Sequence, residues 1–213
     1  MPKDTFFNLS EEKQDKVMRS AISEFLNQGF EKGNIGEIAK QAGVAKGSMY
    51  QYFENKKELF LYSVRWAMDI MTKKYSSIQS VPANNLFESL YQSSKETWRQ
   101  FKVEKELTIF LQDVFLGKFS SVADESLAQM MKMSDEFVLQ LIRDGKKNGT
   151  IRNDIADHIL ALFMIGASIK FKQDFLNKVK DAGESVLDDH FYEAHDHEIR
   201  SFTDLLINGM GAK

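Results

Sequence analysis

The 213-residue sequence contains no cysteine and only two prolines. Without cysteine the chain forms no disulfide, binds no metal through a thiolate and has no cysteine nucleophile, which fits the reducing cytoplasm where we expect it to act. No uncharged run reaches the ~20 residues that a membrane helix needs, and residues 1–5 lack the apolar core of a signal peptide. Because proline is scarce and amphipathic stretches are long, we expect an all-α fold.

An excess of positive charge is also missing. The net charge is −3: residues 1–57 carry nine Lys and Arg against eight Asp and Glu, and the remainder carries nineteen against twenty-three. Overall charge therefore does not draw this chain to nucleic acid. Any such attraction has to come from the local placement of a few lysines, among them Lys46, Lys56 and Lys57.

The motifs by which common enzyme classes are recognised do not occur. The sequence contains no G-x-x-x-x-G-K-[ST], H-E-x-x-H, G-x-S-x-G or G-x-G-x-x-G element, and no Glu-x-x-His pair of the di-iron kind. His190, His195 and His197 lie among acidic residues, but the His-x-His spacing does not put two ligands on one face of a helix. We therefore expect no enzyme activity, no cofactor and no metal site.

What the sequence does contain is a pair of short predicted helices joined by a glycine turn in residues 34–56. Asn34 is a suitable N-cap for the first helix, with Glu37 three residues later as in a capping box. Gly43 follows the last apolar position, where a left-handed backbone suits glycine. The second helix is predicted from about Lys46 to Tyr52, with Met49 and Phe53 facing the core.

The remaining residues of the second helix are suited to a DNA major groove. They are Lys46, Gly47, Ser48, Tyr50, Gln51 and Tyr52. Lysine donates to guanine or phosphate, serine and glutamine bond base edges, and tyrosine offers a hydroxyl to phosphate and a ring to a thymine methyl. A glycine inside a helix costs about 1 kcal/mol of stability, but it lets the helix approach closely. The pattern predicts a helix-turn-helix; the alternative is a surface hairpin with ordinary tyrosines.

The same residues resemble a known family. The run Glu37-Ile38-Ala39, Ala42 to Phe53, Asn55-Lys56 and Glu58-Leu59 is similar to the N-terminal domain of the tetracycline-repressor (TetR) family of bacterial regulators. One departure is Ala45, which stands where that family usually has a Ser or Thr cap on the recognition helix. The resemblance covers roughly residues 10–65.

The resemblance implies three groups of DNA contacts. Base-facing positions would be Lys46, Gly47 and Ser48; positions touching the backbone or thymine would be Tyr50, Gln51 and Tyr52; phosphate contacts would come from Asn34 and Lys56.

Two domains are expected: a three-helix DNA-binding domain in residues 1–55, and a helical-bundle domain for effector binding and dimerisation in residues 56–213. Further helices are predicted for residues 10–28, 56–78, 84–101, 104–116, 154–179 and 196–209, with an irregular connector over 181–195. Another long helix is predicted to begin at Ser121 or Asp124 and to end near residue 147.

The second domain is rich in aromatic and methionine side chains, most of which would simply form the core of a bundle. The TetR resemblance implies a small-molecule site there, and such linings suit a lipophilic or amphipathic effector better than a sugar or nucleotide. The candidate lining residues are Trp98, Phe101, Phe110, Met130, Met133, Phe137 and Phe163.

The last two predicted helices carry apolar residues at helical spacing, and the final one carries them on more than one face, which suggests a two-fold dimer. The candidate interface comprises Ile155, Ile159, Leu162, Phe163, Gly166 and Ile169, with Ile199, Phe202, Leu205, Leu206, Gly209 and Met210. The combined expectation is a homodimeric, ligand-responsive repressor that leaves a palindromic DNA operator when its effector binds. The alternative is a helical-bundle small-molecule-binding protein or enzyme with a structural N-terminal hairpin, which would have no use for an exposed Lys46, Tyr50, Tyr52 and Lys56.

Overall fold

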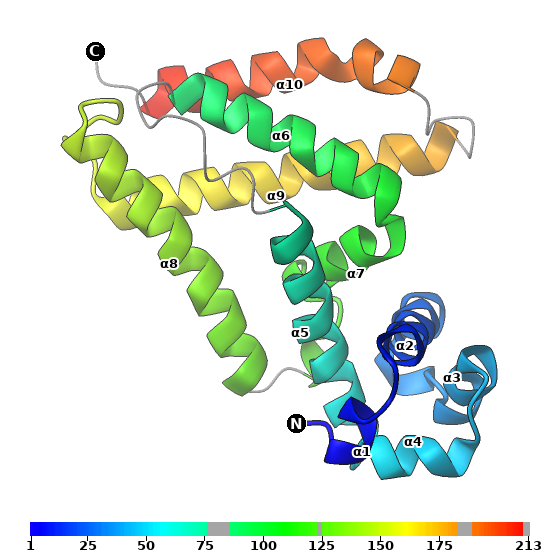
Figure 1. Cartoon of the computed structure of the whole chain (residues 1–213). Helices are drawn as coiled ribbons and strands as arrows, with labels where there is room; N and C mark the ends of the chain where they lie inside the picture. The colour runs from blue at the N-terminus through cyan, green and yellow to red at the C-terminus, as the bar shows by residue number, and fades with distance from the viewer. Residues whose placement is uncertain (76–85, 123–124, 183–188, 211–213) are drawn as a thin grey trace. The chain divides into compact units, whose positions relative to one another are not determined.

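The computed structural model describes residues 1–75, 86–122, 125–182 and 189–210 (Figure 1). Within these ranges every regular element is a helix, which confirms the all-α expectation. The elements are α1 (Asp4–Phe7), α2 (Glu11–Lys32), α3 (Ile35–Ala42), α4 (Lys46–Tyr52), α5 (Lys56–Tyr75), α6 (Leu86–Val103), α7 (Lys105–Phe115), a short 3₁₀ turn η2 (Ser120–Val122), α8 (Glu125–Lys147), α9 (Asp157–Ala182) and α10 (Asp189–Met210).

The helices form two compact units. One contains residues 1–73 and 106–130, and the other contains residues 74–105 and 131–213. The first unit thus holds the predicted helix-turn-helix together with most of α5 and with α7, both of which come from beyond the predicted 1–55 domain.

The first unit is built around aromatic rings. Phe60 of α5 lies with its ring centroid 5.2 Å from Phe25 of α2, 5.7 Å from Phe110 of α7 and 5.0 Å from Phe119. All four side chains are buried. Burial of rings of this size contributes heavily to stability, so α5 and α7 are part of the core that supports α2, α3 and α4.

The predicted helix ends follow their local signals. The Ser10 side chain caps α2, accepting from the Lys13 amide at 3.4 Å. Gly29, directly after the predicted helix over residues 10–28, has φ +72° and interrupts α2, although helical turns continue to Lys32. Gly117 and Gly149, which follow α7 and α8, also have positive φ.

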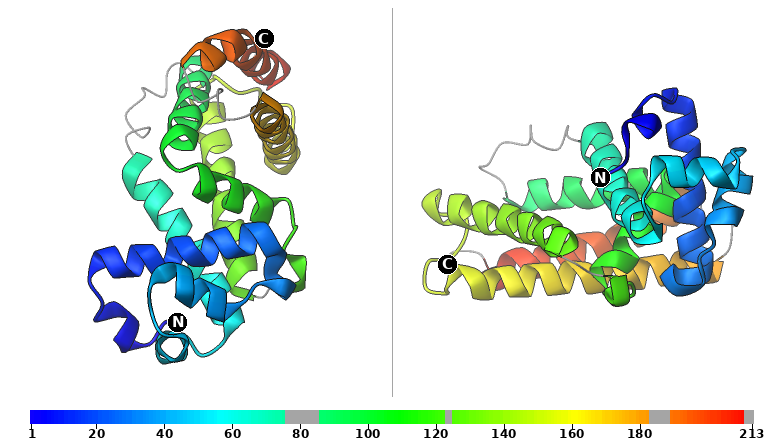
Figure 2. Two further views of the ribbon diagram at one scale, coloured as in Figure 1. Left: turned by 90° about the vertical axis from the view of Figure 1, so that its right-hand side faces the viewer. Right: turned by 90° about the horizontal axis from the view of Figure 1, so that it is seen from below.

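The second unit pairs α6 with α10, which lie side by side (Figures 1 and 2). The buried Tyr91 of α6 donates its hydroxyl to the Asp196 carboxylate and accepts from Arg200 Nη2 at 2.7 Å, both on α10. Burial, together with the hydrogen bond to Asp196, raises the pKa of Tyr91. These groups join the two helices through a closed polar network.

One predicted boundary in this unit is wrong. Helix α10 begins at Asp189, not at Asp196, so residues 189–195 are helical where an irregular connector was expected. Four of these seven residues are acidic or histidine, so they form no apolar stripe that would predict a helix. No glycine or proline interrupts the chain between Asp189 and Asn208, so nothing prevents the helix from starting earlier.

Candidate nucleic-acid interface

The turn between α3 and α4 has the predicted geometry. Asn34 Oδ1 accepts a hydrogen bond from the Gly36 amide at 2.8 Å, which caps α3. The Asn34 amide in turn donates to the buried Glu24 carboxylate of α2 at 3.0 Å. Gly43 ends α3 in the left-handed region with φ +70°, and the following Val44 amide donates to Ala39 O at 2.9 Å. The start of α3 is thus fixed to α2, and its end directs the chain into α4.

Helix α4 presents most of the predicted face to solvent. Lys46, Gly47, Tyr50 and Gln51 are exposed and Ser48 is half-buried. Met49 is buried, as is Phe53 immediately after the helix. The exposed side chains include a cation, a hydroxyl group and an amide, which are the groups that read base edges and phosphates.

Tyr52 does not belong to this exposed face, so the prediction that its side chain points outward is wrong. It is only 8% exposed, and its ring centroid lies 6.1 Å from that of Phe6. The physical reason is helical spacing: Tyr52 follows Met49 by three residues and so shares its inward side.

The two glycines of the motif differ in what surrounds them. A Cβ at Gly36 would lie 3.1 Å from Asn34 Oδ1 and 3.6 Å from Lys46 Cδ, so this glycine makes room for the cap and for the lysine stem. A Cβ at Gly47 would meet nothing within 4 Å. Packing within the protein therefore gives no reason for glycine at position 47, although the residue weakens the helix.

Lys56 has protein partners of its own. Its ammonium donates to Glu31 O at 2.9 Å and to Gly33 O at 3.2 Å, and it lies 4.9 Å from the centre of the Phe30 ring. These contacts join the start of α5 to the connection between α2 and α3. An ammonium has three donors, so a phosphate contact from Lys56 would have to add to these bonds.

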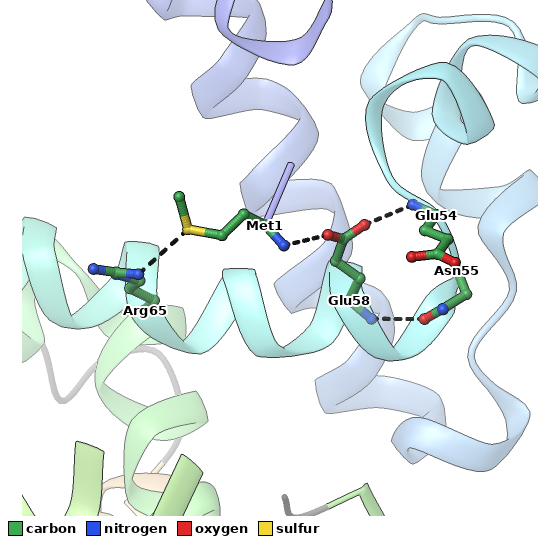
Figure 3. A network of polar contacts seen from close by, with 5 residues as sticks. All are labelled: Met1, Glu54, Asn55, Glu58 and Arg65. Atoms are coloured by element: carbon green, nitrogen blue, oxygen red, sulfur yellow. Dashed lines mark hydrogen bonds and ion pairs between the residues drawn. The ribbon is translucent and has the colours of Figure 1, made fainter. Parts of the chain in front are cut away.

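The chain after α4 is held by a small polar network (Figure 3). Asn55 Oδ1 caps α5 by accepting from the Glu58 amide at 2.9 Å, and Glu58 Oε2 accepts from the Glu54 amide at 2.6 Å. The ammonium of Met1 pairs with the same Glu58 carboxylate. The network fixes the turn that leads from α4 into α5, and it uses an amide at the α5 N-terminus that would otherwise be open to phosphate.

The predicted effector residues are not gathered in one place by the described structure. Phe101 is buried against Phe175, with ring centroids 6.3 Å apart, in the second unit. Phe110 belongs to the aromatic core of the first unit. Phe163 is 43% exposed on α9. The side chains of Trp98, Met130, Met133 and Phe137 lie outside the described part of the molecule.

Sequence reasoning did not single out Lys172 of α9. This residue is half-buried, and burial lowers the pKa of its amine. Among the residues that the structure describes, no hydrogen bond or ion pair reaches it. A desolvated amine without a partner is costly, and Lys172 precedes Phe175 by one helical turn. The signal in the sequence was a lysine at helical spacing from Phe175 and Val179, where an apolar residue would continue the inner stripe.

Large apolar side chains remain exposed on α9 and α10. Leu162 is 68% exposed and Leu205 62%; Ile159 and Phe163 are exposed as well. The ring of Phe163 lies 3.9 Å from where a Cβ on Gly209 would be, so the stripes on the two helices adjoin. We call Ile159, Leu162, Phe163 and Leu205 the apolar stripe.

Other members of the predicted dimer interface face inward. Leu206 and Ile199 are buried within the subunit, and the Phe202 ring stacks on that of Phe171 at 4.1 Å. Their assignment to an intersubunit surface is corrected: they serve the core of their own subunit, where Leu206 packs with Ile142 and Leu160.

The described residues give no support for a metal site or for a membrane-spanning helix. Their His, Asp and Glu side chains form no group of three or more able to hold a metal ion. The side chain of His190 lies outside this description. None of the described helices is long and apolar enough to cross a membrane.

Comparison with known proteins identifies the helix-turn-helix. Residues 17–62 match the family model described as bacterial regulatory proteins, tetR family. The biofilm operon icaADBC HTH-type negative transcriptional regulator IcaR of Staphylococcus aureus (strain Newman) is 22% identical over 142 residues, covering 63% of this chain and 76% of that protein.

Solved structures with a similar fold match nearly the whole length of this chain. A TetR family transcriptional regulator from Chloroflexus aurantiacus has a TM-score of 0.72 at 22% identity, covering 100% of both chains. The transcriptional regulator FadR from Bacillus subtilis, solved in complex with stearoyl-CoA, has a TM-score of 0.71 at 17% identity, covering 92% of this chain and 98% of that one. At these identities the likeness establishes the fold.

Proposed function

Since the chain belongs, through its N-terminal domain, to the tetR family of bacterial regulatory proteins, we propose that it is a dimeric repressor which binds a palindromic operator through α4 and leaves it when an acyl effector binds. The single observation that carries the DNA-binding role is the exposed face of α4, which combines Lys46, Ser48, Tyr50 and Gln51 with a glycine that the fold does not require. The negative regulation named for IcaR supports the repressor role.

Gly47→Ala distinguishes a structural from a DNA-binding role for this face. The substitution should raise the stability of the protein by about 0.5–1 kcal/mol, because alanine favours the helix and the added methyl group meets no atom. It should weaken operator binding about tenfold or more, because the methyl group comes between the helix and the groove. Thermal unfolding and fluorescence anisotropy measure the two effects.

The matched control is Asn27→Ala, an exposed position on α2 where alanine also raises helix propensity. It should stabilise the protein and leave operator affinity unchanged. If Gly47→Ala stabilises the protein and binds the operator as tightly as the wild type, α4 does not approach DNA closely.

The effector that we propose has an acyl chain and an anionic group. The aromatic pair Phe101 and Phe175 and the desolvated amine of Lys172, all in the second unit, support this chemistry, since an anion would supply the partner that Lys172 lacks among the described residues. FadR from Bacillus subtilis, whose fold this chain shares, was solved with stearoyl-CoA. Trp98, Met133 and Phe137, which belong to the same unit, remain predicted lining residues of this site.

Titration calorimetry with long-chain acyl-CoA, with and without operator DNA, tests this proposal. Because linkage is reciprocal, an inducer must bind the operator-bound protein more weakly than the protein alone. Lys172→Met should weaken acyl-CoA binding about tenfold or more, whereas Lys147→Met, which removes an exposed lysine at the end of α8, should not. Equal affinity in both conditions would exclude an allosteric inducer of this class.

A further inference from the structure

Residues close to the N-terminus of the chain donate hydrogen bonds to the backbone carbonyls at the C-terminal end of α4. The last four carbonyls of a helix have no partner within it. At α4, Met49 O accepts from the Phe53 amide at 2.9 Å. The other three accept from residues 3–5: Tyr50 O from Lys3 Nζ at 2.9 Å, Gln51 O from the Thr5 hydroxyl, and Tyr52 O from the Lys3 amide at 2.9 Å. Every terminal carbonyl of α4 is thus satisfied.

This closure matters because α4 is weak by itself. It has seven residues, contains Gly47, and starts at Ala45 without a side-chain cap. Helices this short are not stable alone, and both a missing cap and an internal glycine lower their stability further. The Lys3 ammonium also places a positive charge at the negative end of the helix dipole.

An aromatic anchor holds the segment in place. Phe6 of α1 is fully buried, with ring centroids 5.0 Å from Phe53 and 5.6 Å from Tyr62. Phe53 directly follows α4 and Tyr62 lies on α5. Residues 3–6, which we call the N-terminal clasp, therefore combine three donors for α4 with one buried ring that fixes them.

We propose that the N-terminal clasp positions the recognition helix, and that Lys3 and Thr5 are positioning residues for DNA binding that act through α4. The inference rests on the proposed DNA-binding function of α4. In this proposal Lys3 does not act as a basic arm that contacts DNA. Its ammonium donates to the protein backbone and so holds the side chains of Tyr50 and Gln51 in position. Removing the clasp would leave every DNA-contacting side chain present but loosely held.

The experiment uses Lys3→Met, which keeps the aliphatic stem, Thr5→Val, which keeps the shape, and Lys3→Arg, which keeps a donor. Lys118→Met is the control, since it removes one positive charge whose partner, Asp113, is remote in sequence from α4. Hydrogen exchange of the α4 amides is measured without DNA, and operator affinity is measured over a range of salt concentrations.

Lys3→Met and Thr5→Val should each speed exchange in α4 and weaken operator binding about five- to tenfold, as expected for the loss of a helix-terminal hydrogen bond. The salt slope should not change, and Lys3→Arg should restore much of the affinity. A slope reduced by about 0.9 with unchanged exchange would make Lys3 a phosphate contact and overturn the proposal. Unchanged exchange and affinity in both variants would overturn it too.

Lys46→Ala in the same assay separates this proposal from the proposed function. If Lys46→Ala leaves DNA binding intact while Lys3→Met still speeds exchange in α4, the clasp positions the helix but α4 does not read DNA. If Lys46→Ala abolishes specific binding while the clasp variants change neither exchange nor affinity, α4 reads DNA without the clasp.

Discussion

The double variant Leu162→Glu/Leu205→Glu is expected to be a folded monomer that no longer binds its operator specifically. Both side chains are largely exposed in the subunit, so carboxylates there cost the isolated subunit little. In a two-fold dimer built on the apolar stripe, the same carboxylates would be buried without partners next to their own copies. Loss of the second half-site should weaken operator binding by a factor of about 100 or more. Light scattering and anisotropy measure the two effects.

The control for this variant is Val103→Glu. Val103 of α6 is 62% exposed, much as Leu205 is, but it lies outside the apolar stripe. It should leave both dimerisation and DNA binding unchanged. By contrast, a charge at Leu206 should lower the melting temperature, because that side chain packs in the subunit core. A Leu162→Glu/Leu205→Glu protein that remains dimeric would place the interface elsewhere.

The second large effect is expected for Lys46→Ala/Tyr50→Ala. Both side chains are exposed, so we expect their removal to change the stability of the fold little. A base contact contributes about 1–3 kcal/mol of discrimination, so loss of Lys46 should reduce the preference for operator over scrambled DNA. Loss of Tyr50 should weaken binding to both duplexes, because phosphate contacts carry no sequence information.

Anisotropy with operator and scrambled duplexes, and circular dichroism for the fold, check this prediction. Lys118→Ala serves as the control for a lost positive charge. Normal operator binding by a folded Lys46→Ala/Tyr50→Ala protein would mean that α4 is not the recognition helix.

Local signals made the helix-turn-helix predictable from sequence. A cap at Asn34, a left-handed glycine at position 43 and the inward spacing of Met49 act within a few residues, so their interpretation did not depend on distant partners. The same locality explains the cap at Ser10 and the positive φ of Gly117 and Gly149, which stand at or just beyond ends of predicted helices.

Such local signals do not predict which distant residues a side chain packs against in the folded protein. An apolar residue on α10 is equally apolar whether it faces its own core, as Leu206 does, or solvent, as Leu205 does. Phe110 was assigned to an effector site, but its ring packs in the first unit on Phe60, fifty positions earlier. The hydrogen bonds of the N-terminal clasp join residues that lie 46 to 49 positions apart in the sequence. A pairing over this distance leaves no periodic pattern from which it could be predicted.

Above all, we propose that the exposed face of α4 reads the bases of an operator half-site. In-vitro selection from a random DNA library, performed with the wild type and with Lys46→Gln, tests it most directly. The wild type should enrich an inverted repeat with half-sites about one helical turn, or a multiple, apart. Lys46→Gln should enrich the same repeat with one guanine in each half-site replaced by adenine, since glutamine pairs with adenine. A wild type that enriches no sequence, or a variant that enriches an unchanged one, would contradict the account.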